Sequence, residues 1–276
     1  MGILLGLASA VLYGSSDFAG GLLSRRLGLM RVSVIDSAAA VVVAWIALIV
    51  SGAPEPTVRA IAWGLVSGLG SGIGTLALYR GLARGQMSVV EPVSAVAAAA
   101  VPVAVGIAIG ERPSALAVIG VLVALPAIVL VAASGTVRGK LGEGLSDGLV
   151  AGLAFGLLFV GLAQAGRNAG LWPVAAEQTS ALLPILIIAV RSREPLGLPV
   201  RDAIWPALSG AGAMAASALY FYATHFAMLA TAAVLVSLYP GVTVLLARLV
   251  LNERFSVTQR VGLVLCTLAV IAIALN

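Results

Sequence analysis

Ten apolar runs, each close to twenty residues long, follow one another along the chain with only short connections between them. A hydrocarbon core about 30 Å thick needs about 20 helical residues at 1.5 Å per residue. Closed β-barrels also span membranes, but these runs show no two-residue alternation and therefore favour helices. The predicted spans lie at 2–23, 32–51, 59–79, 88–109, 115–133, 146–165, 172–190, 204–224, 230–250 and 256–275.

The composition indicates that lipid surrounds these helices. Hydrophobic residues make up 61% of the 276 residues and charged residues 10%, whereas about 25% of the residues in a soluble domain are charged. Such a chain cannot cover its surface with polar groups. We expect a multi-pass protein of a bacterial-type inner membrane, with membrane lipids as its immediate partners and an oligomeric state that the sequence leaves open.

Several function classes are disfavoured by what the chain lacks. The net charge is +5, but its basic residues stand singly or in pairs, so we expect no nucleic-acid partner. Cys266 is the single cysteine and His225 the single histidine, and no metal-ligand spacing or P-loop occurs. We therefore expect no cofactor, no metal site, no catalytic residues and no enzymatic activity.

The chain matches itself when it is shifted by 142 residues. Near the third run the shift slips to 141, where Leu78-Tyr79 meets Leu219-Tyr220. Glycine matches alone would be weak in a chain with 32 glycines, but tryptophan and charged residues match as well. The matched positions include Arg25 with Arg167, Gly28 with Gly170, Trp63 with Trp205, Gly68 with Gly210, and Glu111-Arg112 with Glu253-Arg254.

This repeat predicts the architecture. Each copy holds five runs, an odd number, so the second copy enters the membrane from the opposite side. The predicted fold is all-α: ten transmembrane helices in two inverted five-helix repeats, 1–134 and 146–276, joined by a loop at 135–145. Inverted repeats of this kind are typical of secondary transporters that work by alternating access.

Motifs at the end of each copy resemble a known family. The stretch Leu238-Tyr239-Pro240 through Asn252-Glu253-Arg254, and its counterpart Gly110-Glu111-Arg112, are similar to the ends of EamA-type repeats. EamA-type transporters belong to the drug/metabolite transporter superfamily. The resemblance covers essentially the whole chain and implies ten helices around a central cavity, with export or uptake of small metabolites.

Basic residues divide unevenly between the two ends of the predicted helices. Connections 1–2, 3–4, 5–6, 7–8 and 9–10 hold twelve of them and the other connections three, which favours a cytoplasmic location for the first set. Both termini would then lie outside. The family resemblance implies the reverse, with both termini in the cytoplasm, so the orientation stays open.

Asp17 is the most informative acidic residue. It falls inside the first predicted span, where a carboxylate costs about 2.5–3.5 kcal/mol on insertion scales, so it should face the bundle interior. A functional interpretation makes it a proton-coupling or cation-binding group. The alternative is a structural aspartate that is hydrogen-bonded to a neighbouring serine or to a facing backbone group.

Other polar residues in the spans are weaker candidates for substrate or ion contact. Glu91 precedes Pro92 and marks either a helix break beside the cavity or a plain interfacial carboxylate. Glu177 and Asp36 are nearly equivalent in the two copies. Tyr79, Tyr220 and Tyr239 line a cavity or belong to the interfacial belt, and His225 is an interfacial residue or a proton relay.

Two further patterns favour structural roles. We interpret Glu111-Arg112 and Glu253-Arg254 as local ion pairs that anchor helix ends. Glycines four residues apart, Gly64-Gly68-Gly72 and Gly148-Gly152-Gly156, allow close helix packing. The glycine-rich run 67–74 could also interrupt its helix and expose backbone groups.

The sequence thus favours a secondary transporter of small metabolites, such as amino acids or related organic solutes, and we expect export. A second hypothesis is a proton-coupled drug or cation exporter that uses Asp17 as its charge-binding group. An intramembrane enzyme or a non-transporting scaffold is less favoured, because a Ser–His pair would have to use His225 and a scaffold gives no reason for an inverted duplication.

Overall fold

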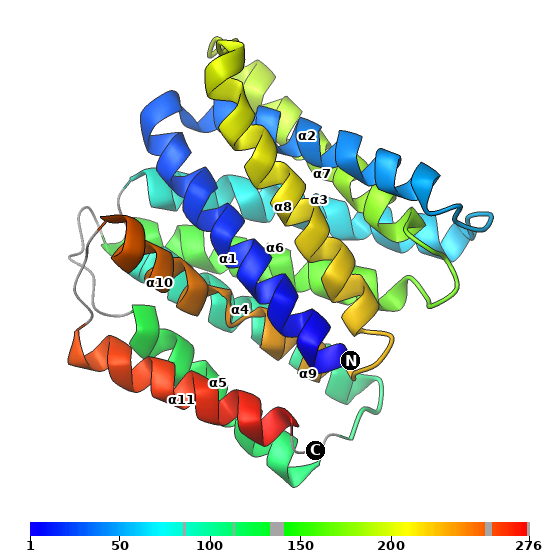
Figure 1. Cartoon of the computed structure of the whole chain (residues 1–276), viewed down its shortest axis with the longest axis vertical. Coiled ribbons are helices and arrows are strands. Elements are labelled where there is room, and N and C mark those ends of the chain that lie inside the picture. Colours follow the sequence, from blue (N-terminus) through cyan, green and yellow to red (C-terminus); the bar gives the residue numbers. More distant parts are fainter. Residues whose placement is uncertain (85–86, 113, 133–140, 252–255, 275–276) are drawn as a thin grey trace.

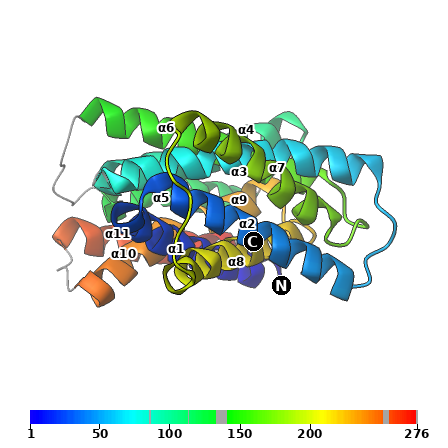
Figure 2. The same cartoon turned by 90° about the horizontal axis from the view of Figure 1, so that it is seen from above.

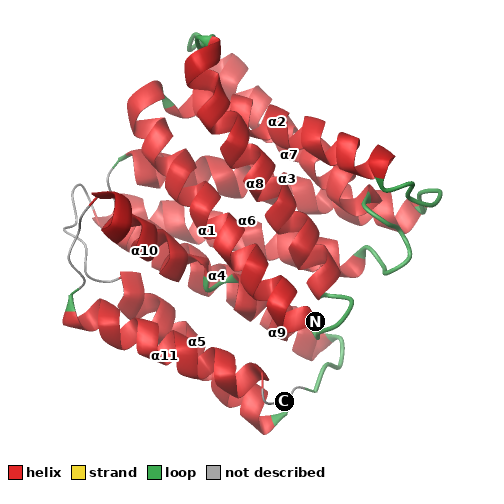
Figure 3. Cartoon of the chain, viewed as in Figure 1, coloured by secondary structure: helices red, strands yellow, loops and turns green. Residues whose placement is uncertain are grey.

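The computed structural model describes residues 1–84, 87–112, 114–132, 141–251 and 256–274. Within these residues every regular element is a helix (Figure 3). The helices are α1 Gly2–Leu27, α2 Leu29–Val50, α3 Val58–Ala83, α4 Met87–Ala108, α5 Ala115–Ala132, α6 Leu141–Gln164, α7 Trp172–Ser192, α8 Val200–Ala223, α9 Leu229–Val236, α10 Tyr239–Leu251 and α11 Val257–Ala274 (Figure 1).

Nine of the ten predicted runs each form one helix, but the ninth is broken. The run expected at 230–250 divides into α9 and α10, which are separated by a turn at residues 237 and 238. Pro240 has no backbone N–H and cannot bond to the carbonyl four residues earlier. The backbone N–H of Leu238 therefore bonds back to Leu235 and that of Gly241 to Leu238, as in a tighter turn.

Length and hydropathy identify five helices in the described residues that could each cross a membrane. These helices are α1, α2, α3, α7 and the segment Glu143–Gln164 of α6. Two shorter apolar helices, Val93–Ala108 and Leu229–Thr243, belong to α4 and to the broken ninth run. The chain is therefore a multi-pass membrane protein, and membrane crossing by the other helices stays a prediction.

Helix contacts are reciprocal between the two sequence copies. The 142-residue shift relates α1 to α6, α2 to α7, α3 to α8, α4 to α9–α10, and α5 to α11. α3 packs against α6 and α7, and its equivalent α8 packs against α1 and α2. The equivalent helices α5 and α11 pack on each other and form one edge of the molecule (Figure 1). In Figure 2, seen from above, this edge lies on the far side, behind the other helices.

Glycines in α3 and α6 allow these helices to approach their neighbours. A Cβ atom added at Gly68 would meet the Glu177 carbonyl oxygen on α7, and one at Gly152 would meet the Ser94 carbonyl oxygen on α4. α3 also runs unbroken through residues 67–74. Of the two interpretations of the glycine-rich run, close packing therefore describes this structure, and no backbone break is present in it.

Candidate functional site

A polar chamber lies at the centre of the bundle, between α1, α2, α3, α6, α7 and α8. Its volume is about 30 Å³, which is about the volume that one water molecule occupies in the liquid. The residues that line it are Tyr13, Asp17, Asp36, Ser37, Ala40, Ser71, Gly72, Thr75, Tyr79, Phe155, Gln178, Ala181, Ala213 and Ser217.

Hydrogen bonds connect the polar side chains of the chamber across both copies. The Tyr79 hydroxyl donates to Asp36 Oδ1 at 3.3 Å. On the opposite wall, the Ser217 hydroxyl donates to Glu177 Oε1 at 3.1 Å and lies 2.6 Å from the Tyr13 hydroxyl. Glu177 is fully buried behind Ser217, so it is one hydrogen bond away from the chamber surface.

Two glycines hold the backbones of these acidic residues in place. Gly68 and Gly210 are equivalent at the 142-residue shift. A Cβ atom at Gly68 would collide with the carbonyl group of Glu177, and one at Gly210 would collide with the carbonyl group of Asp36. In each copy, therefore, a glycine of the third helix packs directly on the backbone carbonyl group of an acidic residue in the other copy.

Asp17 lies on the chamber wall with an exposed fraction of 9%. In the described part of the chain its carboxylate makes no hydrogen bond or ion pair, and Glu91 and Asp36 are the acidic groups near enough to act on it electrostatically. No arginine, lysine or histidine occurs among the residues that line the chamber. The chamber is therefore suited to a positively charged group or to protons.

Three other predicted residues are buried close to the chamber without lining it. Glu91 is 2% exposed, and its two carboxyl oxygens have no partner among the described residues. α4 runs unbroken through Glu91, because a proline near a helix start removes only one intrahelical hydrogen bond. The Tyr239 hydroxyl donates to Ser94 Oγ at 3.2 Å, and the Tyr220 hydroxyl donates to the Phe159 carbonyl at 2.9 Å.

Several residues that line the chamber belong to no local sequence motif, but the internal repeat could have identified them. Hydroxyl and amide side chains occur throughout the chain, so a local pattern does not single out those that converge. Much of the chamber lining nevertheless consists of positions related by the 142-residue shift. The equivalent pairs are Tyr13 with Phe155, Asp36 with Gln178, Ser71 with Ala213, and Thr75 with Ser217.

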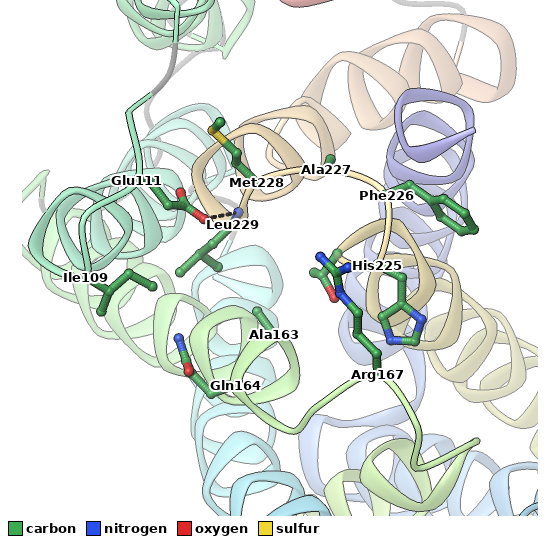
Figure 4. A pocket seen from close by; sticks show the side chains of 11 residues that line it. Ile109, Glu111, Ala163, Gln164, Arg167, His225, Phe226, Ala227, Met228 and Leu229 are labelled. Carbon is green, nitrogen blue, oxygen red and sulfur yellow. Dashed lines mark hydrogen bonds between the residues drawn. The ribbon is translucent and has the colours of Figure 1, made fainter.

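A larger pocket, with a volume of about 560 Å³, lies at one end of the bundle. Its walls come from the ends of α4 and α6 and from the α8–α9 linker (Figure 4). Glu111 lines it and caps α9: its carboxylate accepts the backbone N–H groups of Leu229 at 2.7 Å and Ala230 at 3.1 Å. We refer to this pocket as the end pocket.

The role expected for Glu111-Arg112 needs correction. No ion pair between them is found in the described residues, and Arg112 is exposed. Glu111 instead joins the end of α4 in the first copy to the start of α9 in the second, where a carboxylate satisfies otherwise unpaired N–H groups and complements the helix dipole. Glu253 and Arg254 lie outside the described residues.

Replacing Glu111 with alanine should lower the free energy of unfolding by about 1–3 kcal/mol, because two backbone N–H groups lose their acceptor. The melting temperature of the purified protein measures this loss. Glu55→Ala is the control, since Glu55 is exposed in the α2–α3 connection. Equal melting temperatures for the two variants would contradict the capping role.

His225 borders the end pocket next to Arg167. Its ring packs edge-on against Phe221 and Tyr222, with centroid distances of 4.7 and 5.6 Å. Burial, and secondly the positive charge of Arg167, lower the pKa of His225 below its usual value. His225 is therefore neutral at pH 7, and none of the residues that line the central chamber is a histidine.

The bundle of apolar helices around a buried polar chamber is that of a polytopic membrane protein. The model of the EamA-like transporter family matches residues 1–133 and 143–275. The chain therefore belongs to the EamA-like transporter family, within the drug/metabolite transporter superfamily. Members of this family are membrane transporters, and this family membership is consistent with the expectation that the chain is not an enzyme.

The fold also matches solved structures. One crystal structure superimposes with a TM-score of 0.77 at 15% sequence identity, over 99% of this chain and 98% of the other. At this level of identity the match shows the fold alone. No curated protein matches the sequence.

Proposed function

We propose that the protein is a secondary-active transporter that moves small organic solutes across a bacterial-type inner membrane by alternating access. The central chamber carries this proposal, because equivalent residues of the two copies line it together. Reciprocal helix packing, α3 on α6 and α7 and α8 on α1 and α2, supports the view that the copies are inverted about an axis through the chamber. An inverted pair can open to either side at similar energy.

The volumes of the chamber and of the end pocket fit a stage of the transport cycle in which the chamber is closed and one end of the bundle is open. Ligand sites for small molecules usually measure about 300–1,000 Å³, so the chamber at about 30 Å³ is closed to any organic solute. The end pocket, at about 560 Å³, is large enough for one. Transport therefore requires the helices around the chamber to separate.

The side chains of the chamber favour one solute class over another. An amino acid carries a carboxylate, which would find no basic side chain among the residues that line the chamber. An ammonium group would find Asp17 and Asp36, together with several hydroxyl groups. This asymmetry supports the second candidate, a proton-coupled exporter of organic amines and cations, over an exporter of amino acids.

Transport by the purified protein in liposomes tests the function. We expect saturable movement of a lipophilic amine dye that is driven by a pH gradient, and slower movement of a zwitterionic amino acid; empty liposomes are the control. Faster movement of the amino acid would restore the metabolite interpretation. Movement of neither solute, in either direction of the gradient, would refute the transporter proposal.

A further inference from the structure

The two ends of the bundle differ although the sequence repeat makes them equivalent. Arg25, at the end of α1, donates from Nε to the Leu82 carbonyl oxygen at the end of α3 at 2.7 Å. The repeat relates Arg25 to Arg167 and, at the 141-residue shift of this region, Leu82 to Ala223. The equivalent hydrogen bond, from Arg167 to the Ala223 carbonyl, is not formed in the described structure.

Arg167 instead extends from the α6–α7 linker into the end pocket, beside His225 (Figure 4). Its guanidinium group makes no hydrogen bond or ion pair with any residue that the structure describes. The Ala223 carbonyl accepts the backbone N–H groups of Phe226 and Ala227, at 3.0 and 3.1 Å. Backbone N–H groups of the α8–α9 linker therefore occupy the Ala223 carbonyl, which is the equivalent of the Leu82 carbonyl that accepts from Arg25.

Helix packing follows the same asymmetry. The backbones of α1 and α3 pack closely, while those of the equivalent helices α6 and α8 lie farther apart and the helices meet through the side chains of Phe159 and Tyr220. The close seam between α1 and α3 depends on Gly21, since a Cβ atom added there would lie 2.6 Å from Leu82 Cδ1. The end pocket fills the crevice between the ends of α6 and α8, with Ala163, the equivalent of Gly21, on its wall.

Ion pairs between the two copies accompany the closed seam. Arg80, on α3, contacts Asp147 on α6 at 2.6 Å, and Arg84 contacts the same carboxylate at 3.3 Å. The Asp147 side chain is 2% exposed, so it is deeply buried for a charged group. The repeat relates Arg80 to Phe221, Arg84 to His225 and Asp147 to Leu5. With leucine in place of the aspartate, no equivalent ion pair can form at the other end of the bundle.

An aromatic layer separates the end pocket from the chamber. The Phe159 ring contacts Tyr13, which lines the chamber, and Tyr220, with centroid distances of 6.2 and 4.7 Å. The adjacent Phe221 ring contacts His225, which lines the end pocket. A solute in the end pocket is therefore one layer of side chains away from the acidic groups.

From these observations we infer that the end pocket is the open mouth of the transport route, and that Arg25 and Arg167 are equivalent gating residues that close opposite mouths in turn. Arg25 holds the seam between α1 and α3 shut through the carbonyl of Leu82. In the opposite state Arg167 bonds to the carbonyl of Ala223, the crevice between α6 and α8 narrows, and Arg25 is released. This inference rests on the proposed function, because it assigns the two mouths to an alternating-access cycle.

Thiol labelling at two equivalent positions tests the gating roles. Ala83→Cys and Thr224→Cys, which are related by the 141-residue shift, report on the closed and open mouths in a Cys266→Ser background. In nanodiscs both mouths are reached by a polar maleimide, and Thr224→Cys should label faster. Arg25→Gln should raise the labelling rate of Ala83→Cys relative to that of Thr224→Cys by roughly ten-fold, because the state with the closed α1–α3 seam loses one charge-assisted hydrogen bond.

Three further variants distinguish a gating role of Arg25 from a local structural one. Arg167→Gln should slow labelling at Ala83→Cys, because the opposite state loses its bond, and Arg26→Gln, an exposed neighbour of Arg25, should change neither rate. Gly21→Ala gives α1 the residue that α6 carries and should open the same seam with Arg25 intact. If Arg25→Gln speeds labelling at Ala83→Cys but Arg167→Gln leaves that rate unchanged, Arg25 is a local structural contact and the inference is wrong.

Parallel transport measurements separate this inference from the proposed function. Reciprocal labelling in a protein that moves no solute would support the gates and refute the function. Solute movement together with purely local labelling changes would support the function and refute the gates.

Discussion

Gly68→Val is expected to remove most of the folded protein. Any β-carbon at position 68 would occupy the space of the Glu177 carbonyl oxygen and Ser180 Oγ, and the backbone of α7 cannot rotate away as a side chain can. Overpacking costs about 1–3 kcal/mol even in adaptable cores. We expect more than about 3 kcal/mol here, a large part of the about 5–15 kcal/mol that holds a typical protein together.

Fluorescence-detected size-exclusion chromatography and the melting temperature of the monodisperse fraction measure the effect of Gly68→Val. Gly210→Val should behave alike, because its Cβ atom would meet the Asp36 carbonyl group. Gly197→Val is the control, since a Cβ at this exposed position in the α7–α8 connection would meet nothing within 4 Å. A Gly68→Val protein that elutes and melts like the Gly197→Val protein would show that α3 and α7 can move apart without loss of stability.

The fold was largely predictable because the membrane sets the length of a helix. Runs of about twenty apolar residues gave nine helices close to the predicted positions. The break at residues 237 and 238 was missed because apolar residues continue through it, and hydropathy does not record the backbone N–H that Pro240 lacks. The inverted orientation of the two copies was a prediction from the odd helix number and remains a proposal.

The chamber was only partly predictable. Asp17 and Asp36 were candidates because burying a carboxylate in a membrane is costly and needs a reason. Ser217 and Gln178 were missed because a helix that is apolar on all sides has no face to indicate its rotation in the bundle. Which polar side chains converge depends on that rotation, and here glycines such as Gly68 fix it through contacts between helices from different copies.

The role of Glu111 shows the limit of a local interpretation. Its neighbour Arg112 suggested an ion pair within the motif, yet the partner of Glu111 is the start of α9, more than a hundred residues away in the chain. A helix N-terminus attracts a carboxylate wherever the fold brings the two together. The sequence identified the residue, but only the packing of the two copies identifies its partner.

Asp17→Asn is expected to reduce pH-driven transport of a lipophilic amine at least about ten-fold in kcat/KM. Asp17 lines the chamber and forms no ion pair in the described structure, so its charge is available to a cation. Two unit charges 4 Å apart interact by about 4 kcal/mol at an effective dielectric constant of 20. Part of this attraction remains, because Asp36 lies on the same chamber wall, so the expected loss is smaller than the full interaction.

Asparagine keeps the size of aspartate and can make similar hydrogen bonds, so the loss should be one of charge rather than of fold. The Asp17→Asn protein should therefore melt at or above the temperature of the parent protein, because a neutral side chain is cheaper to bury. Asp202→Asn, in the first turn of α8 and outside the chamber, is the control and should leave transport unchanged. If Asp17→Asn moves the amine at the parent rate with the same dependence on the pH gradient, the carboxylate binds neither the cation nor the proton. The solute would then be recognised by the uncharged groups of the chamber, and the case for a neutral or zwitterionic metabolite would become the stronger one.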